Sequence, residues 1–125
     1  MIITQGADFT AAMNQTIDLD HLEQYICGDL ALRDEILTIF DEQARMWVHR
    51  LRPSDEDEAW RDAAHALKGA ARGVGAWRIG DLCEAAEALI SGAPEKIAKR
   101  RAILNEIAEL VNEAVGEARR LRDCA

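Results

Sequence analysis

Apolar residues return every three or four positions through most of this 125-residue chain, and this spacing constrains its fold more than any other feature. Such spacing places the apolar side chains on one face of an α-helix. Four long segments show it, at about residues 30–51, 55–73, 76–90 and 94–121. The chain has only 2 prolines; Pro53 lies between two of these segments, and Pro94 opens the last one. The sequence therefore predicts an all-α protein.

Amphipathic helices of this length cannot bury their apolar faces alone, and short loops between them favour antiparallel neighbours. We expect an antiparallel four-helix bundle with an additional short N-terminal helix. That helix is expected to begin at Asp20, where Asp20 and Glu23 form a capping-box pattern, and to end at Gly28. Residues 1–17 show no periodicity and are predicted to form a flexible arm, and residues 18–125 are predicted to form the bundle.

Capping residues predict where the longer helices begin. Asp29 and Ser54 are the expected N-caps of the segments that follow them, and Pro94 suits the first position of the last helix. The buried faces of the first and last long helices are expected to comprise Leu32, Ile36, Phe40, Ala44, Trp47 and Leu51, and Ile97, Leu104, Ile107, Val111, Ala114, Ala118 and Leu121.

Composition excludes several classes of function. A formal net charge of −8 argues against nucleic-acid binding, which depends on a positive field. No apolar run approaches the ~20 residues that cross a membrane, and the N-terminus lacks the pattern of a secretory signal. We therefore expect a cytoplasmic protein that binds no membrane.

The remaining polar residue types indicate no second site. Cys27, Cys83 and Cys124 lie far apart and are expected to be free thiols. No histidine has a metal-ligand partner at helical spacing, so no metal site is expected, and His21 and His49 are interpreted as solvated or capping residues. The basic residues of the last helix are expected to be surface charges: Lys96, Lys99, Arg100, Arg101, Arg119, Arg120 and Arg122.

The segment DEAWRDAAHALKGAARGVG carries the most specific pattern of the chain. At ~100° per residue, its apolar residues gather on one side of the helix. His65 falls opposite the centre of that apolar stripe, so its imidazole is predicted to stand in solvent midway along a bundle helix. The same exposed face carries Glu58, Arg61, Asp62, Lys68, Gly69 and Arg72.

This face has the chemistry of a phosphoryl carrier. A solvated histidine in general titrates near ~6.5, so at neutral pH one ring nitrogen holds a free lone pair and can attack a phosphoryl donor. Lys68 and Arg72 could neutralise phosphoryl oxygens beside His65. Gly69 costs ~1 kcal/mol relative to alanine in mid-helix, which close approach of another protein would explain. The alternative interpretation is an ordinary solvated histidine among ordinary surface charges.

The run His65-Ala66-Leu67-Lys68-Gly69-Ala70, followed by Gly75, resembles the signature of the histidine-phosphotransfer (HPt) domain family. The resemblance extends over residues 18–122, nearly the whole chain. It implies a monomeric helical bundle that accepts a phosphoryl group from a receiver-domain aspartate and passes it to another receiver. Members carry the group on the histidine Nε2, which here would be that of His65.

The resemblance also implies roles for the neighbours of His65. Lys68 would balance the charge of the phosphoryl group, Gly69 would give clearance to the docking partner, and Gly75 would serve the turn that ends the helix. Arg72 is added from its helical phase alone. The magnesium of the reaction would belong to the receiver, so this chain needs no cofactor. The expected partners are response-regulator receiver domains or a hybrid histidine kinase.

The partner surface is predicted less directly. Leu30 and Leu37 lie off the main apolar stripe of their helix and could contact the receiver, or else pack beneath the first helix. Arg61 and Asp62 share the exposed face with His65. Trp77 could pack against the end of a neighbouring helix or anchor the interface.

A different class of function stays open at this point. The same bundle could act as a phosphate-independent adaptor that docks a receiver or kinase without using its histidine. The chain has no phosphate-binding loop of the G-x-x-x-x-G-K-[ST] type and no room for an ATP-binding kinase module. We therefore predict a phosphoryl carrier that cannot phosphorylate itself from ATP.

Overall fold

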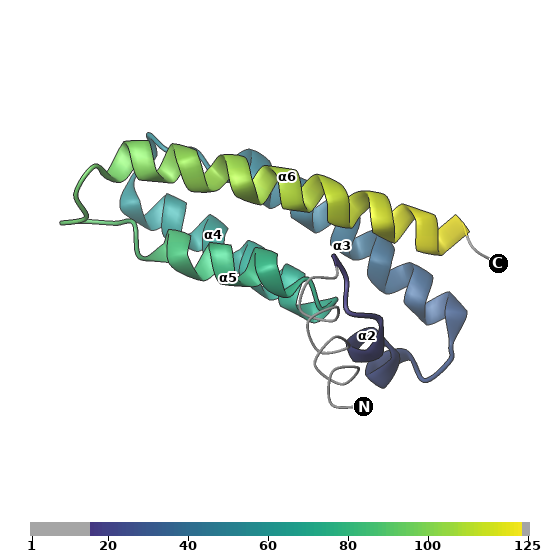
Figure 1. Ribbon diagram of the computed structural model, residues 1–125. Coiled ribbons are helices and arrows are strands. Elements are labelled where there is room, and N and C mark those ends of the chain that lie inside the picture. Colours follow the sequence, from purple (N-terminus) through teal and green to yellow (C-terminus); the bar gives the residue numbers. More distant parts are fainter. Residues whose placement is uncertain (1–15, 124–125) are drawn as a thin grey trace, which may run out of the picture.

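The computed structural model describes residues 16–123, and this part of the chain forms five helices and no strand. They are α2 (Leu19–Ile26), α3 (Leu30–Arg50), α4 (Asp57–Gly73), α5 (Trp77–Glu87) and α6 (Lys96–Asp123). Each of the four longer helices runs antiparallel to the one before it, and α2 lies across one end of the bundle (Figure 1). The predicted four-helix bundle with an extra short helix is therefore confirmed.

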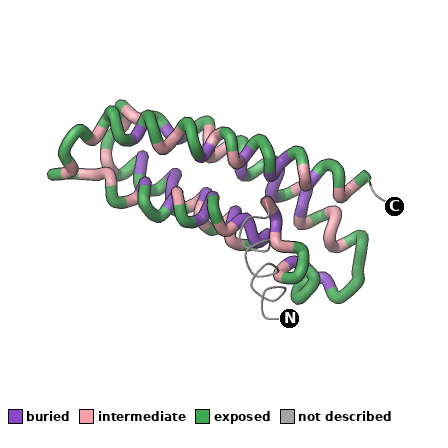
Figure 2. The backbone as a smooth tube through the Cα atoms, in the orientation of Figure 1, coloured by how far each residue is buried: buried purple, intermediate pink, exposed green. Residues whose placement is uncertain are grey.

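Each long helix packs against two others, with α4 beside α3 and α5, and α6 beside α3 and α5. The buried positions lie mainly along the sides of the helices that face one another (Figure 2). The core includes Leu37 and Phe40 of α3, Trp60, Ala64, Leu67 and Ala71 of α4, Ile79, Cys83 and Ala86 of α5, and Ile107, Val111, Ala114 and Ala118 of α6. No described helix is long and apolar enough to cross a membrane.

The first helix starts earlier than the capping box predicted. Asp18, and not Asp20, is the N-cap, and its carboxylate accepts a hydrogen bond from the backbone N–H of His21. Ile17 is buried beside this turn. Residues 1–15 of the expected arm lie outside the described residues. At the other end, Cys27 and Gly28 both adopt positive φ, and Asp29 caps α3 through the backbone N–H of Leu32, as predicted.

The boundaries at the opposite end of the bundle differ from the predictions, and the side chain of Arg100 contacts the segments involved. This side chain is fully buried, although it was expected at the surface. Its guanidinium donates to the backbone oxygens of Pro53, Asp55 and Leu89 and to the carboxylate of Asp57, and it lies over the ring of Trp60. A local capping rule cannot anticipate a contact from so far along the chain.

Arg100 thereby organises the starts of α4 and α6. α4 begins at Asp57 after Glu56, with no side-chain cap, so the prediction that Ser54 caps it is wrong. α5 ends at Glu87, ahead of the predicted stop at residues 91–92. α6 begins at Lys96 and not at Pro94, because Glu95 adopts a positive φ that breaks the helix. Ile97, expected in the core, is 48% exposed.

The cysteines of the described region differ in environment. Cys27 is exposed and Cys83 is buried, and both are free thiols. Cys124 lies outside the described residues. Within residues 16–123, no group of three or more histidine, cysteine or acidic side chains could hold a metal ion.

Candidate functional site

The central helix of the site, α4, owes its straight run to its sequence. Apart from Trp60, the buried face consists of alanine and leucine, both strong helix formers, and Asp57 and Glu58 lie in the first turn, where the helix dipole favours acids. The helix ends in a Schellman motif: the backbone N–H of Ala76 donates to the oxygen of Ala71, and that of Gly75 donates to the oxygen of Arg72. This sharp end lets α5 return antiparallel to α4.

His65 stands near the middle of α4 with its side chain 72% exposed, as its helical phase predicted. Its Nδ1 lies 2.7 Å from Oε1 of Glu87 on α5. A carboxylate can only accept a hydrogen bond, so Nδ1 must carry the proton. In the neutral ring, the lone pair is then at Nε2, and no described residue hydrogen-bonds this nitrogen. The geometry therefore presents Nε2 to solvent as the nucleophile.

Lys68 is joined to His65 through the same carboxylate. Its Nζ lies 2.8 Å from Oε2 of Glu87, and its side chain is mostly buried against α5. Partial burial raises the pKa of Glu87, but the hydrogen bonds from Lys68 and His65 outweigh this effect and hold the pKa below its usual value. Glu87 is therefore an ionised acceptor that holds two residues of α4 at once.

Sequence reasoning missed Glu87, although a signal for it was present. In an antiparallel helix pair, each step back from the turn on one helix matches a step forward on the other. The turn between α4 and α5 places Gly80 against Arg72, where an added Cβ would come within 2.9 Å of the Arg72 side chain. Continuing in the same register reaches Glu87 opposite His65. The prediction needed the length of the turn as well as the helical phase of α4.

Arg72 does not join the group around His65. Its guanidinium lies 3.4 Å from Glu84 and 3.7 Å from Asp81, both on α5, so its charge is already paired one turn further along. Nearby, burial raises the pKa of the Cys83 thiol to about 12, and the Glu87 carboxylate adds to this effect. Cys83 is therefore a neutral core residue beneath the site.

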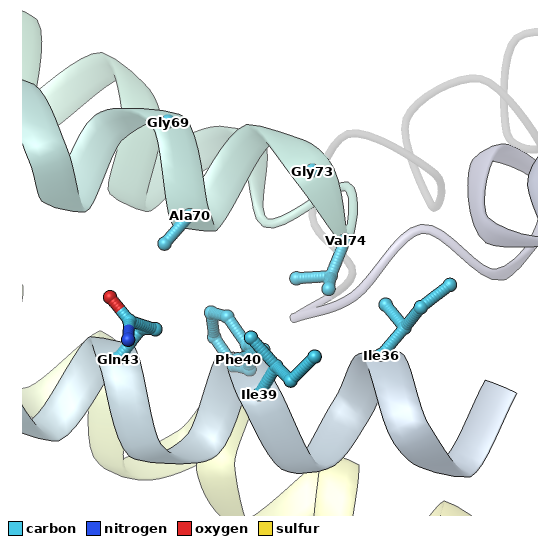
Figure 3. Close-up of a pocket in the computed structure, with 8 residues that line it drawn as sticks. All are labelled: Ile36, Ile39, Phe40, Gln43, Gly69, Ala70, Gly73 and Val74. Carbon is cyan, nitrogen blue, oxygen red and sulfur yellow. The ribbon is translucent and has the colours of Figure 1, made fainter. Parts of the chain in front are cut away.

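Gly69 borders both His65 and a groove on the other side of α4. The groove lies between α3 and α4 and is lined by Ile36, Ile39, Phe40, Gln43, Gly69, Ala70, Gly73 and Val74. Figure 3 shows the side chains of α3 pointing across this gap toward α4, and those of Ala70 and Val74 pointing back into it. A Cβ added at Gly69 would meet nothing within 4 Å. The space beside His65 is therefore open and apolar on this side.

The residues predicted for a partner surface fall into different places. Leu37 is fully buried in the core, so the interpretation that it contacts a partner is wrong and the packing interpretation fits. Leu30 is half-exposed but does not line the groove. Arg61 and Asp62 are exposed on α4 next to the turn that carries His65.

Trp77 and Gly75 serve the junction with α2. The Trp77 indole N–H donates to Asp18 Oδ2 at 2.9 Å, and its ring meets that of His21 edge-on. Gly75 has φ +75°, and an added Cβ would come within 2.5 Å of the Asp18 Cβ. Both residues therefore fix the turn that follows α4, and the packing interpretation of Trp77 accounts for its contacts.

Comparison with known proteins decides what this site belongs to. A family model described as the Hpt domain matches residues 18–120. The chain belongs to the Hpt family. Its fold also resembles the crystal structure of the histidine phosphotransferase ShpA from Caulobacter crescentus, with a TM-score of 0.58. The two chains are 37% identical, and the match covers 85% of this chain and 97% of that one. A search of curated proteins found no match.

Family membership settles the class of activity. Hpt domains relay phosphoryl groups between receiver domains and kinases, so this Hpt protein is a phosphoryl carrier of a phosphorelay and not a kinase. The predicted fold class and function are thereby confirmed. Which atom carries the group, and where partners dock, are questions for the geometry of the site.

Proposed function

We propose that this protein carries the phosphoryl group on Nε2 of His65, taking it from a receiver-domain aspartate and giving it to the aspartate of another receiver. One observation carries the proposal: His65 is the exposed residue whose Nδ1 is held by Glu87 while Nε2 is open. His49 is also exposed but has no such carboxylate partner among the described residues.

The neighbours of His65 fit this role unequally. Lys68 shares the Glu87 carboxylate with His65, and it supplies the cation that offsets the negative charge of a phosphoryl group on His65. Arg72 is engaged by Glu84 and Asp81, so its contribution is to hold α4 and α5 together. Gly69 supplies clearance beside the nucleophile, and Gly75 keeps α4 and α2 in place. The proposal requires no metal on this chain, because the magnesium of the reaction would be bound by the receiver.

The receiver docks over His65 and the adjoining groove. Ile39, which is 52% exposed, forms the open edge of this groove and supplies apolar surface that a receiver helix can cover. Arg61 and Asp62 provide the polar rim next to His65. A monomer suffices, because the whole site comes from one chain.

Label transfer tests this assignment. A receiver carrying radioactive phosphate on its aspartate is mixed with wild type, His65→Gln or His49→Gln. We expect an acid-labile, alkali-stable label on wild type and His49→Gln, and none on a correctly folded His65→Gln variant. Labelling of His65→Gln at the wild-type rate would reject His65 as the acceptor. Binding of a receiver without any transfer to wild type would instead support the phosphate-independent adaptor.

A further inference from the structure

Glu87 touches the one ring nitrogen of His65 that takes no part in the bond to phosphorus. We propose that Glu87 is a positioning residue that keeps Nδ1 of His65 protonated in the phosphorylated carrier. The imidazole is then a good leaving group when the aspartate of the next receiver attacks phosphorus. The inference rests on the proposed role of His65. It adds a residue and a pH dependence that the family assignment does not supply.

The first transfer shows why a carboxylate is useful there. The Nε2 lone pair attacks the phosphorus of the aspartyl phosphate, an Nε2–P bond forms, and the P–O bond to the aspartate breaks as that carboxylate leaves. No proton moves, so the ring keeps its Nδ1 proton and becomes positively charged. The Glu87 carboxylate, 2.7 Å from Nδ1, stabilises this charge.

The return step depends on the same proton. An aspartate oxygen of the next receiver attacks phosphorus, and the Nε2–P bond breaks with its electron pair returning to Nε2. If Nδ1 still carries its proton, the departing group is neutral imidazole. If that proton has been lost, the departing group is an imidazolide anion, which is a far poorer leaving group. A contact that retains the proton therefore keeps the phosphorylated carrier competent at higher pH.

The charges around the ring favour this assignment to Glu87. On α4, Lys68 binds the other oxygen of the same carboxylate, and the exposed Arg61 and Asp62, one turn before His65, form no described hydrogen bond or ion pair with its ring. On α5, Cys83 is a neutral thiol, and Glu84 and Asp81 face Arg72. The part of α3 that lines the groove offers Ile36, Ile39, Phe40 and Gln43, none of them charged. Among the described residues, Glu87 is the carboxylate in contact with His65.

Nuclear magnetic resonance can follow the Nδ1 proton directly. The full chain, labelled with ¹⁵N in its histidine rings, is phosphorylated with potassium phosphoramidate, and ring nitrogen shifts are recorded as the pH is raised. His65→Gln identifies the signals of residue 65. We expect loss of the Nδ1 proton in Glu87→Gln at a pH about one unit lower than in wild type, the size of shift that one nearby charge produces. Glu84→Gln is the matched control on the same helix and should titrate like wild type.

The outcomes separate this inference from the proposed function. If folded wild type and folded Glu87→Gln lost the Nδ1 proton at the same pH, the role of Glu87 would be overturned and His65 would remain the carrier. Absence of any phosphorylated His65 in wild type would reject the proposed function itself.

Lys68 needs its own control, because Glu87→Gln also releases this cation near the ring. The double variant Glu87→Gln, Lys68→Gln removes both charges. We expect the pH at which the Nδ1 proton is lost to stay below the wild-type value in this double variant, because the carboxylate is still missing. Return of the midpoint to the wild-type value would assign the effect to the freed lysine and contradict the inference.

Discussion

The two helix pairs of this bundle are each joined by a carboxylate, and the contrast between them separates structure from function. On the α3–α6 side, Asp41 is only 5% exposed and accepts hydrogen bonds from Arg45, Arg119 and Arg122. On the α4–α5 side, Glu87 is 18% exposed and is held by His65 and Lys68. Both carboxylates join neighbouring helices through cationic or polar donors.

The difference lies in what the donors have left to offer. Arginine has donors only and stays protonated, so the partners of Asp41 have no lone pair with which to react. Histidine gives one nitrogen to Glu87 and keeps a second one free. The same kind of contact is therefore a structural tie in one region and a support for a nucleophile in the other. Substitutions can test whether the two regions behave as differently as this contrast requires.

The largest effect on stability is expected at Arg100 of α6, which contacts the start of α4 and the loop after α5, away from His65. Arg100→Met should lower the free energy of unfolding by about 3 to 5 kcal/mol, because three backbone oxygens lose a buried donor. Urea denaturation measures this loss, with the exposed neighbour Lys99→Met as control. A loss below about 1 kcal/mol would show that the buried tie is not structural.

Asp41→Asn should lower the free energy of unfolding by a smaller amount, about 2 kcal/mol at pH 7, because the arginine partners of Asp41 can turn to solvent. Burial raises the pKa of Asp41, but hydrogen bonds from Arg119 and Arg45 hold it below the ordinary value of 3.8. The stabilisation is therefore complete above the unfolded pKa and is lost as the pH falls through the lower folded pKa.

Urea titrations of wild type and Asp41→Asn from pH 7 to pH 3 check this dependence. The difference in free energy of unfolding between the two proteins should become smaller only below about pH 4. Glu87→Gln should lower the free energy of unfolding by only about 1 kcal/mol in the same assay, since His65 is largely exposed and the glutamine amide oxygen still accepts a hydrogen bond from Lys68. A gap that stayed constant to pH 3 would contradict the role given to the Asp41 carboxylate.

Ile39→Asp tests the groove beside the site. It should raise the KM for a phosphorylated receiver about tenfold, or ~1.4 kcal/mol, because a carboxylate would have to be buried on docking. Ile97→Asp is the matched control, since Ile97 is about equally exposed but lies on α6, away from the site. Steady-state transfer assays compare the two. An equal KM for both variants would remove the groove from the docking surface.

The smallest effect is expected at two mid-helix glycines. Gly69→Ala and Gly116→Ala should each raise the free energy of unfolding by about 0.5 to 1 kcal/mol, because both positions have open space for a Cβ. Only Gly69→Ala should also slow transfer, since its methyl group enters the space beside His65. If both variants transferred at the wild-type rate, Gly69 would be no more than a weak point in the helix.

Sequence reasoning reached the bundle and the exposed His65 because both depend on local periodicity. The apolar stripes of Phe40 and Ala44, and of Trp60 and Leu67, are long enough to fix each helix and its phase. Lys68 was placed near His65 for the same reason. These features need no knowledge of how the helices pack.

The errors came from contacts between helices. Leu37 lay off the stripe chosen for its helix, yet α3 is covered on two sides and buries a wider face. The prediction that Arg100 is a surface charge fails because its hydrogen-bond partners come from two loops distant in the sequence. Glu87 was missed because its role depends on the register of α5 against α4. Periodicity within one helix cannot supply any of these.

A reconstituted relay tests the central claim most directly. One receiver, phosphorylated on its aspartate, is freed of its donor and mixed with this protein and a second, unphosphorylated receiver. We predict that phosphate reaches the second receiver through wild type, with the transient label on the peptide containing His65, and that His65→Gln stops the flow. Passage through a folded His65→Gln variant, or a label on another residue, would contradict the account.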